Sequence, residues 1–74
     1  MTLEHIFAQV FSVPENTVND SLALREIPSW DSMTHMMLIV RLEEAFSVEF
    51  TGDEIADFRR VKDIREALNR RDMT

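Results

Sequence analysis

The stretch PSWDSMTHMM, residues 28–37, holds the side chains of this chain that are best suited to chemistry. Ser32 directly follows Asp31 and precedes His35 by three residues. A serine in this setting has three possible roles: it begins a helix, it acts as a nucleophile, or it anchors a covalently attached group. Serine and aspartate are both favoured at helix starts, and the first role explains most such residues in proteins.

The nucleophile is the least favoured of the three roles. A nucleophilic serine needs a general base within hydrogen-bond reach and an acid that orients this base. Helical periodicity places His35, the nearest base, on the face expected to meet the core, and adjacent helix positions such as Asp31 and Ser32 do not face each other. The Gly-x-Ser-x-Gly turn of many hydrolases is absent from the sequence. A helix start and an attachment point therefore remain open.

Length and composition narrow the class of protein. The chain has 74 residues, which predicts one small domain, and its 45% hydrophobic and 30% charged residues suit a folded soluble domain. There is no cysteine, so thiolate chemistry is excluded, and His5 and His35 are too few for a metal cluster. No membrane span and no secretory signal are expected, and a cytoplasmic location is the default expectation.

The charge is negative and uneven. The net charge is −6, which repels a phosphate backbone and disfavours nucleic-acid binding. Residues 1–57 carry 11 acidic and 2 basic residues, a net of −9, whereas residues 58–74 carry 3 acidic and 6 basic residues, a net of +3. The acidic part either steers basic partners or is solvated surface that keeps the chain soluble.

Apolar spacing and helix-start signals predict four helices, at about residues 2–12, 32–46, 52–57 and 61–70. Thr2 is expected to cap the first helix, and Thr51 and Glu54 have the spacing of a capping box at the third. Pro14 ends the first helix and opens a long loop over residues 14–31, which apolar residues are expected to pin: Val18, Leu22, Leu24, Ile27 and Trp30. The predicted fold is all-α, a small four-helix bundle with a long loop between helices one and two and a short third helix.

The helix expected at 32–46 has two apolar faces. One face comprises His35, Leu38, Ile39, Leu42, Ala45 and Phe46, and the nearly opposite face comprises Met33, Met36, Met37 and Val40. One face must meet the core. The methionine face is either covered by the long loop or exposed as a binding surface, for which methionine is well suited because it is flexible and polarizable. Glu43 and Glu44 lie where they could add charge complementarity to that surface.

These motifs together resemble the acyl carrier proteins, the phosphopantetheine-binding carriers. The triplet Asp31-Ser32-Met33 is similar to the family's Asp-Ser-Leu/Met signature, and LIVRLEEAFSVEF follows it as in the family. VPENTVNDSLAL resembles the family's first loop, and TGDEIADFRRVKDI resembles its third and fourth helices. The resemblance covers about residues 3–68 and implies a single carrier domain over residues 1–74.

The resemblance also implies a function. Ser32 would carry 4′-phosphopantetheine through a phosphodiester, a phosphopantetheinyl transferase would install it, and Asp31 would help this transferase to engage the site. The thiol of the arm would hold an acyl group as a thioester, so the chain is a carrier and no enzyme. Its other partners would be an acyl-loading ligase or acyltransferase and a ketosynthase or other acyl-consuming enzyme, in fatty-acid, polyketide or related biosynthesis. The chain is expected to be a monomer.

Family analogy further assigns two sets of positions. The expected partner surface comprises Met33, Met36, Met37, Val40 and Glu44. Core or acyl-pocket positions comprise Ile39, Leu42, Phe46, Phe50, Ile55, Phe58 and Ile64.

The sequence departs from the family pattern at three places, and these departures bear on which partner enzymes the chain would dock to. Trp30 stands before Asp31-Ser32 in a stretch without glycine, which suggests a specialised stand-alone carrier, although a loop anchor over the bundle is the simpler interpretation. Arg41 interrupts a helix that is usually more acidic, and Arg59 and Arg60 stand where serine or threonine is common.

Two alternative functions remain open: an aminoacyl or peptidyl carrier loaded by an adenylating ligase, and an unmodified helical adaptor that binds through the methionine face.

Overall fold

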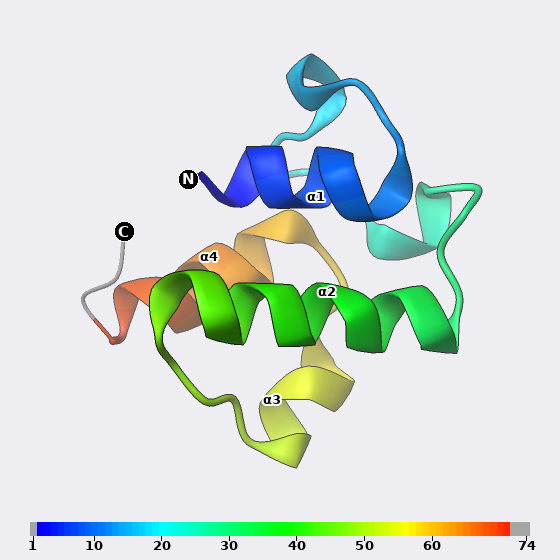
Figure 1. Cartoon of the computed structure of the whole chain (residues 1–74). Helices are drawn as coiled ribbons and strands as arrows, with labels where there is room; N and C mark the ends of the chain where they lie inside the picture. Colours follow the sequence, from blue (N-terminus) through cyan, green and yellow to red (C-terminus); the bar gives the residue numbers. More distant parts are fainter. Residues whose placement is uncertain (1, 72–74) are drawn as a thin grey trace.

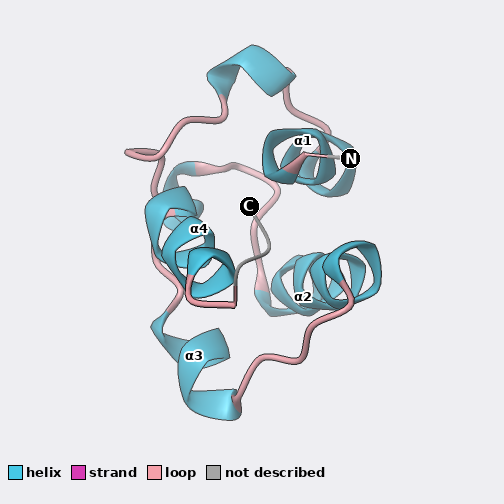
Figure 2. Cartoon of the chain, turned by 90° about the vertical axis from the view of Figure 1, so that its left-hand side faces the viewer, coloured by secondary structure: helices cyan, strands magenta, loops and turns pink. Residues whose placement is uncertain are grey.

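Four α-helices make up the architecture of the computed structural model, which describes residues 2–71. They are α1 (Leu3–Phe11), α2 (Ser32–Phe46), α3 (Gly52–Asp57) and α4 (Val61–Asn69). α1 and α2 pack against each other and run in opposite directions, while the short α3 lies below α4 (Figures 1 and 2). The predicted all-α bundle with a long first loop and a short third helix is confirmed. Met73, which the sequence assigns to the tail, lies outside the described residues.

The helix starts are formed by local side chains. The Thr2 hydroxyl accepts a hydrogen bond from the His5 N–H at 3.1 Å, as expected of an N-cap. At α3, the Glu54 N–H donates to the Thr51 hydroxyl at 3.1 Å, and the Glu54 carboxylate accepts from the Thr51 N–H at 3.0 Å. This reciprocal pair is the capping box that the sequence predicts, and it holds a helix of only six residues.

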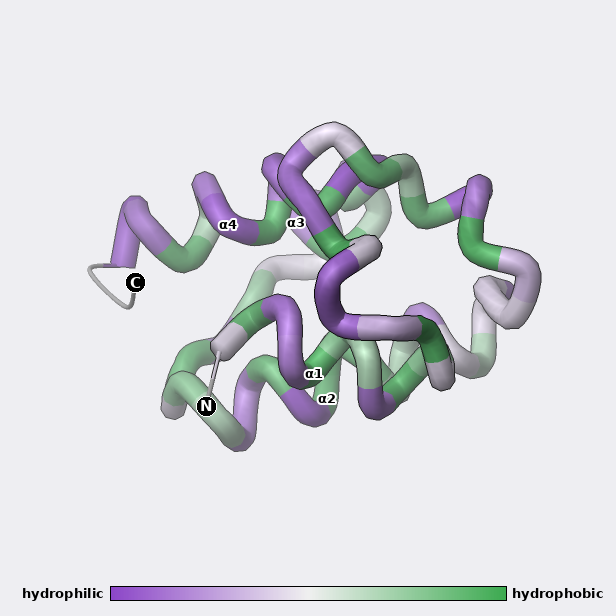
Figure 3. The backbone as a smooth tube through the Cα atoms, turned by 90° about the horizontal axis from the view of Figure 1, so that it is seen from above, coloured by the Kyte–Doolittle hydropathy of each residue, from purple (hydrophilic) through white to green (hydrophobic). Residues whose placement is uncertain are grey.

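The core lies where the apolar stripes of α1, α2 and α4 meet. In Figure 3 hydrophobic residues recur along these helices between hydrophilic ones, as the helical period requires. The largest side chains that are almost fully enclosed are Leu3, Ile6, Phe7, Phe11, Leu24, Leu38, Ile39, Leu42, Val61, Ile64 and Leu68. Phe50 and Phe58 flank α3, and their rings meet edge to face with centroids 5.2 Å apart. The core is therefore continuous from α1 to the loops around α3.

The long loop is ordered by two short 3₁₀ helices, Glu15–Thr17 and Leu24–Glu26, and by its pairing with the start of α4. The Leu24 N–H donates to the Arg59 carbonyl at 2.8 Å, and the Val61 N–H donates to the Leu22 carbonyl at 3.0 Å. An isolated antiparallel bridge joins Ala23 to Arg60. The loop therefore sits beside α4 and closes one side of the bundle (Figure 2).

The apolar residues expected to pin this loop do so unequally. Val18, Leu24 and Ile27 are buried, and Leu22 packs partly against the core. Trp30 is 37% exposed, but its indole N–H donates to His35 of α2 at 3.2 Å and the two rings meet edge to face, so it anchors the loop to the start of α2 and not in the core. The difference arises because the chain turns at residues 28–31 to enter α2, which carries residue 30 away from the core.

Two further positions on α2 differ from expectation. Ala45 belongs to the predicted core face but is exposed, because the last turn of α2 extends past the N-terminal start of α1 (Figure 1). Glu43, which was expected near the methionine face, turns toward the following loop and accepts a hydrogen bond from the Phe50 N–H at 2.9 Å. Glu43 thus positions the link to α3, and only Glu44 stays exposed.

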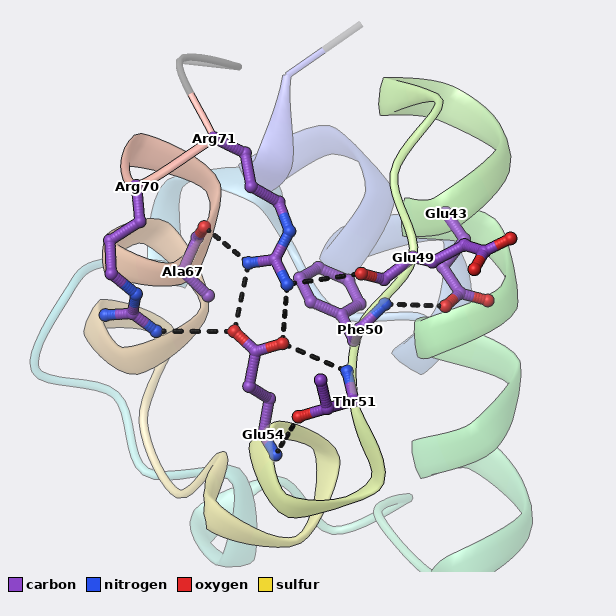
Figure 4. A network of polar contacts seen from close by, with 8 residues as sticks. All are labelled: Glu43, Glu49, Phe50, Thr51, Glu54, Ala67, Arg70 and Arg71. Atoms are coloured by element: carbon purple, nitrogen blue, oxygen red, sulfur yellow. Dashed lines mark hydrogen bonds and ion pairs between the residues drawn. The ribbon is translucent and has the colours of Figure 1, made fainter.

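The most heavily bonded surface contact joins α3 to the end of α4 (Figure 4). The Arg71 guanidinium donates to both Glu54 oxygens, at 2.5 and 2.9 Å, and also to the Ala67 carbonyl at 2.9 Å. It lies over the Phe50 ring, 5.1 Å from the centroid. Arg70 adds a longer contact to Glu54 at 3.4 Å. The basic turn predicted to suit the negative end of the α4 dipole therefore also ties α3 to α4.

No helix among residues 2–71 is long and apolar enough to cross a membrane. Over the same residues, no group of three histidine, cysteine, aspartate or glutamate side chains lies close enough to hold a metal ion.

Candidate functional site

Ser32 is the first residue of α2, and its side chain is exposed. Its hydroxyl has no hydrogen-bond partner among the described residues. The helix that it begins has 15 residues, so the positive end of the helix dipole lies at Ser32. A free, exposed hydroxyl at this place is accessible for a phosphate ester, and the helix dipole favours the negative charge of that ester.

Asp31, and not Ser32, caps the helix. The Thr34 N–H donates to an Asp31 carboxylate oxygen at 2.8 Å, while the Asp31 N–H donates to the Thr34 hydroxyl at 2.8 Å. The backbone N–H and the hydroxyl of Thr34 lower the pKa of Asp31, because both stabilise the ionised carboxylate. The cap therefore leaves the serine hydroxyl free, which separates the two roles that the sequence left open.

Replacement of Asp31 by alanine is expected to destabilise the domain. The Asp31→Ala variant loses the acceptor for the Thr34 N–H, so its Tm in thermal circular dichroism should fall by several degrees. Asp31→Asn is the matched control, since asparagine caps helices about as well as aspartate, and it should keep most of the Tm. Equal Tm values for the alanine variant and the wild type would show that the cap adds nothing to stability.

His35 joins α2 to both neighbouring segments. Its Nε2 lies 3.0 Å from the Ile55 carbonyl oxygen, and its Nδ1 accepts from the Trp30 indole N–H at 3.2 Å. Because a carbonyl only accepts and an indole N–H only donates, Nε2 is the donor and Nδ1 the acceptor in this geometry. Both ring nitrogens are engaged away from Ser32, so His35 is no general base for it. His35 is half-buried and bridges α2 to the loop and to α3. Because Ser32 therefore has no general base at His35, the geometry excludes a nucleophile role for Ser32.

A groove of about 870 Å³ begins at Ser32 and runs between the loop, α2 and α3. Ser32, Trp30, His35 and Met36 line its α2 side. Its other walls comprise Ala23, Leu24, Arg25, Gly52, Ile55, Ala56, Phe58, Arg59 and Arg60. The size lies within the usual range for small-ligand sites. The groove could therefore accommodate a small molecule tethered at Ser32.

The methionine face of α2 is exposed. Met33 is 73% exposed, and Met36, Met37 and Val40 are each about half exposed. A second, mostly apolar groove of about 490 Å³ runs along this face between α1 and α2, and its walls also include Gln9, Val10 and Arg41. The long loop packs beside α4 instead (Figure 2), so the alternative in which the loop covers the methionines is wrong.

Sequence reasoning missed three features of the site. Thr34 stands at the capping-box position but is not the usual glutamate or glutamine, so its role was not apparent. The bridge made by His35 depends on the Ile55 carbonyl, 20 residues away, and left no local signal. In the sequence, Arg59 and Arg60 differ from the family pattern but carry no signal of a groove, because their place in its wall follows from the pairing of this segment with the loop.

The site and the fold agree with comparisons to known proteins. Residues 2–68 match the family described as "Phosphopantetheine attachment site". A similar protein is the "Acyl carrier protein" of Phytoplasma mali (strain AT), with 29% identity over 66 residues, covering 89% of this chain and 79% of that relative. Proteins of this family bear covalently attached 4′-phosphopantetheine and are carriers without enzymatic activity of their own. The exposed, unbonded serine at the start of α2 fits this cofactor. The chain belongs to the phosphopantetheine-attachment family of acyl carrier proteins.

Proposed function

We propose that this chain carries acyl groups as thioesters on 4′-phosphopantetheine attached to Ser32. The observation that carries the proposal is the free, exposed Ser32 hydroxyl at the N-terminus of α2, bordered on one side by a groove and on the other by exposed methionines. Ser32 also stands in the Asp-Ser-Met triplet, inside the region that matches the family.

The residues around Ser32 would support the attached group in two ways. The positive end of the α2 dipole stabilises the negative charge of the phosphodiester. The Asp31–Thr34 cap holds the first turn, so the attachment point has a defined direction. The cofactor itself supplies the terminal thiol that bonds the acyl group, which is the reactive group that this cysteine-free chain lacks.

The partners follow from this role. A phosphopantetheinyl transferase would modify Ser32 and engage Asp31 beside it, an acyl-loading ligase or acyltransferase would charge the arm, and a ketosynthase or other acyl-consuming enzyme would unload it. These enzymes would dock on the surface formed by Met33, Met36, Met37, Val40 and Glu44, which adjoins Ser32. An apolar surface of flexible methionines suits successive binding of several partners. Fatty-acid, polyketide or related biosynthesis would use such a carrier.

The proposal is tested by intact-mass spectrometry. The chain is incubated with coenzyme A, magnesium and a broad-specificity phosphopantetheinyl transferase, and the expected result is a gain of one phosphopantetheine. Incubation with an acyl-coenzyme A in place of coenzyme A should add the acyl group as well, and neutral hydroxylamine should release it because thioesters are cleaved under these conditions. If several transferases produce no gain in mass, the chain is an unmodified adaptor and the carrier proposal fails.

The docking surface makes a separate prediction. Met37→Glu places a charge in the apolar groove, so the KM of the transferase for this carrier should rise by about tenfold or more. Ala45→Glu is the matched control, since it adds the same charge at another exposed position of α2, and its KM should stay within about twofold. In the unbound protein, a soluble paramagnetic agent should broaden the methyl signals of Met33, Met36 and Met37. Equal KM values for the two variants would rule out the methionine surface as the docking site for this enzyme.

A further inference from the structure

The groove beside Ser32 has an unusual charge for this protein. Three arginines line it, Arg25, Arg59 and Arg60, and no aspartate or glutamate does. The chain as a whole has 14 acidic and 8 basic residues, and Arg25 is one of only two basic residues before residue 58. In this acidic protein, the charged side chains that line the groove are therefore all basic, at the place where the arm would be attached.

The other arginines of the helical bundle differ from these three in their partners. Arg65 bonds Glu4 and Asp20, Arg70 and Arg71 bond Glu54, and Arg41 bonds the Gln9 amide. Each of these contacts uses the guanidinium to hold two elements together.

The groove arginines lack such carboxylate partners. Among residues 2–71, the side chains of Arg25 and Arg59 have no hydrogen-bond or ion-pair partner, and Arg60 donates only to the Ser21 carbonyl at 2.7 Å. The guanidinium groups of Arg25 and Arg59 thus make no ion pair within the described part of the chain, although the carboxylates of Glu26 and Asp63 bond backbone N–H groups of the same wall. Backbone pairing of the Leu24 N–H with the Arg59 carbonyl brings Arg25 and Arg59 to the same wall, although they are 34 positions apart.

We propose that this groove receives the far end of the carried acyl group and selects acyl groups that end in a carboxylate, with Arg25 and Arg59 as its counter-ions. The inference rests on the proposed attachment at Ser32. Guanidinium groups bind carboxylates through paired hydrogen bonds, and they do so best where apolar surface limits the access of water. Leu24, Ile55 and Phe58 supply that surface for the methylene part of the chain.

The lining distinguishes this cargo from the alternatives. A plain alkyl chain gains nothing from guanidinium groups without ion-pair partners, and an aminoacyl group brings a positive charge that they repel. Tethering at Ser32 raises the local concentration of the cargo, so even a weak contact with exposed arginines is populated. Arg60, which the Ser21 carbonyl holds in place, adds positive potential to the same wall.

Two acyl groups of equal length test the proposal. The chain is loaded by a phosphopantetheinyl transferase with glutaryl or with pentanoyl from the corresponding coenzyme A ester, which differ in the terminal carboxylate. The form with phosphopantetheine alone is the reference for any contact of the arm's own phosphate. Two readouts are recorded for each form: the arginine Nε–H signals in ¹⁵N-correlated NMR, and the Tm.

The glutaryl form is expected to shift the Arg25 and Arg59 Nε–H signals and to raise the Tm by a few degrees relative to the pentanoyl form. Both effects should disappear in the Arg25→Gln/Arg59→Gln variant and weaken at about 1 M salt, where charges are screened beyond about 3 Å. Lys62→Gln is the matched control, because it removes an exposed positive charge that does not line the groove, and it should keep both effects.

Three results would overturn the inference. Identical arginine signals and Tm values in the glutaryl and pentanoyl forms would show that the groove does not select a carboxylate. Full shifts in the form without an acyl group would assign the arginines to the arm's phosphate. A change in the transferase's KM in the double variant, with no difference between the two acyl forms, would assign them to an acidic surface of a partner. Failure of loading itself would instead count against the attachment at Ser32, so the two proposals fail separately.

Discussion

Ser32→Ala is expected to remain completely unmodified when the wild type gains one phosphopantetheine. The reason is that the phosphodiester needs the hydroxyl oxygen of this residue, and no neighbouring side chain can replace it at the start of α2. Stability should change little, because the hydroxyl makes no hydrogen bond within residues 2–71 and Asp31 supplies the cap. Intact-mass spectrometry after incubation with coenzyme A and a transferase measures the modification, and circular dichroism confirms the fold.

Ser21→Ala is the matched control for this experiment. Ser21 is also exposed and precedes a segment that packs on α4, but it lies in the long loop and not at a helix start. This variant should be modified at the wild-type rate. A gain in mass by Ser32→Ala, or a loss of modification in Ser21→Ala alone, would assign the attachment to a residue other than Ser32.

The second large effect concerns the acid stability of the contact between α3 and α4. Hydrogen bonds from Arg71, followed by the Thr51 N–H, lower the pKa of Glu54 from 4.5 to about 2. Because the folded pKa lies below the unfolded one, the stabilisation is complete above about pH 4.5 and is lost as the pH falls through about 2. The lowering of the pKa from 4.5 to about 2 corresponds to at most about 3.4 kcal/mol of stabilisation, and solvent screening of this partly exposed pair reduces that to roughly 1–2 kcal/mol.

Glu54→Gln should therefore lower the free energy of unfolding at pH 7 by roughly 1–2 kcal/mol, a large share for a domain of this size. It should also flatten the dependence of stability on pH between about 2 and 4.5. Urea unfolding at several pH values measures both effects. Glu44→Gln removes an exposed carboxylate of α2 and is the matched control, which should keep the wild-type pH dependence. A Glu54→Gln profile that parallels the wild type would show that Glu54 does not titrate with folding.

Helix starts and helix faces were predictable from the sequence, because the residues that form them lie close together in the chain. Thr2 and the Thr51–Glu54 box mark the starts of α1 and α3, because each satisfies backbone N–H groups only three residues away. The two apolar faces of α2 were also readable, since a helical period places Leu38 and Met37 on different sides. The exposure of Ala45 was not predictable, because it depends on where α1 begins beside the last turn of α2 in space.

The family signature and the helix start at Ser32 were determined by the sequence alone, because both are carried by adjacent residues, Asp31-Ser32-Met33. Which of the two residues caps the helix was decided by the geometry of Thr34. The groove was decided only by the tertiary structure. Arg25 and Arg59 share its wall because the loop pairs with the start of α4, and a contact over such a distance in the chain leaves no periodic or local pattern in the sequence.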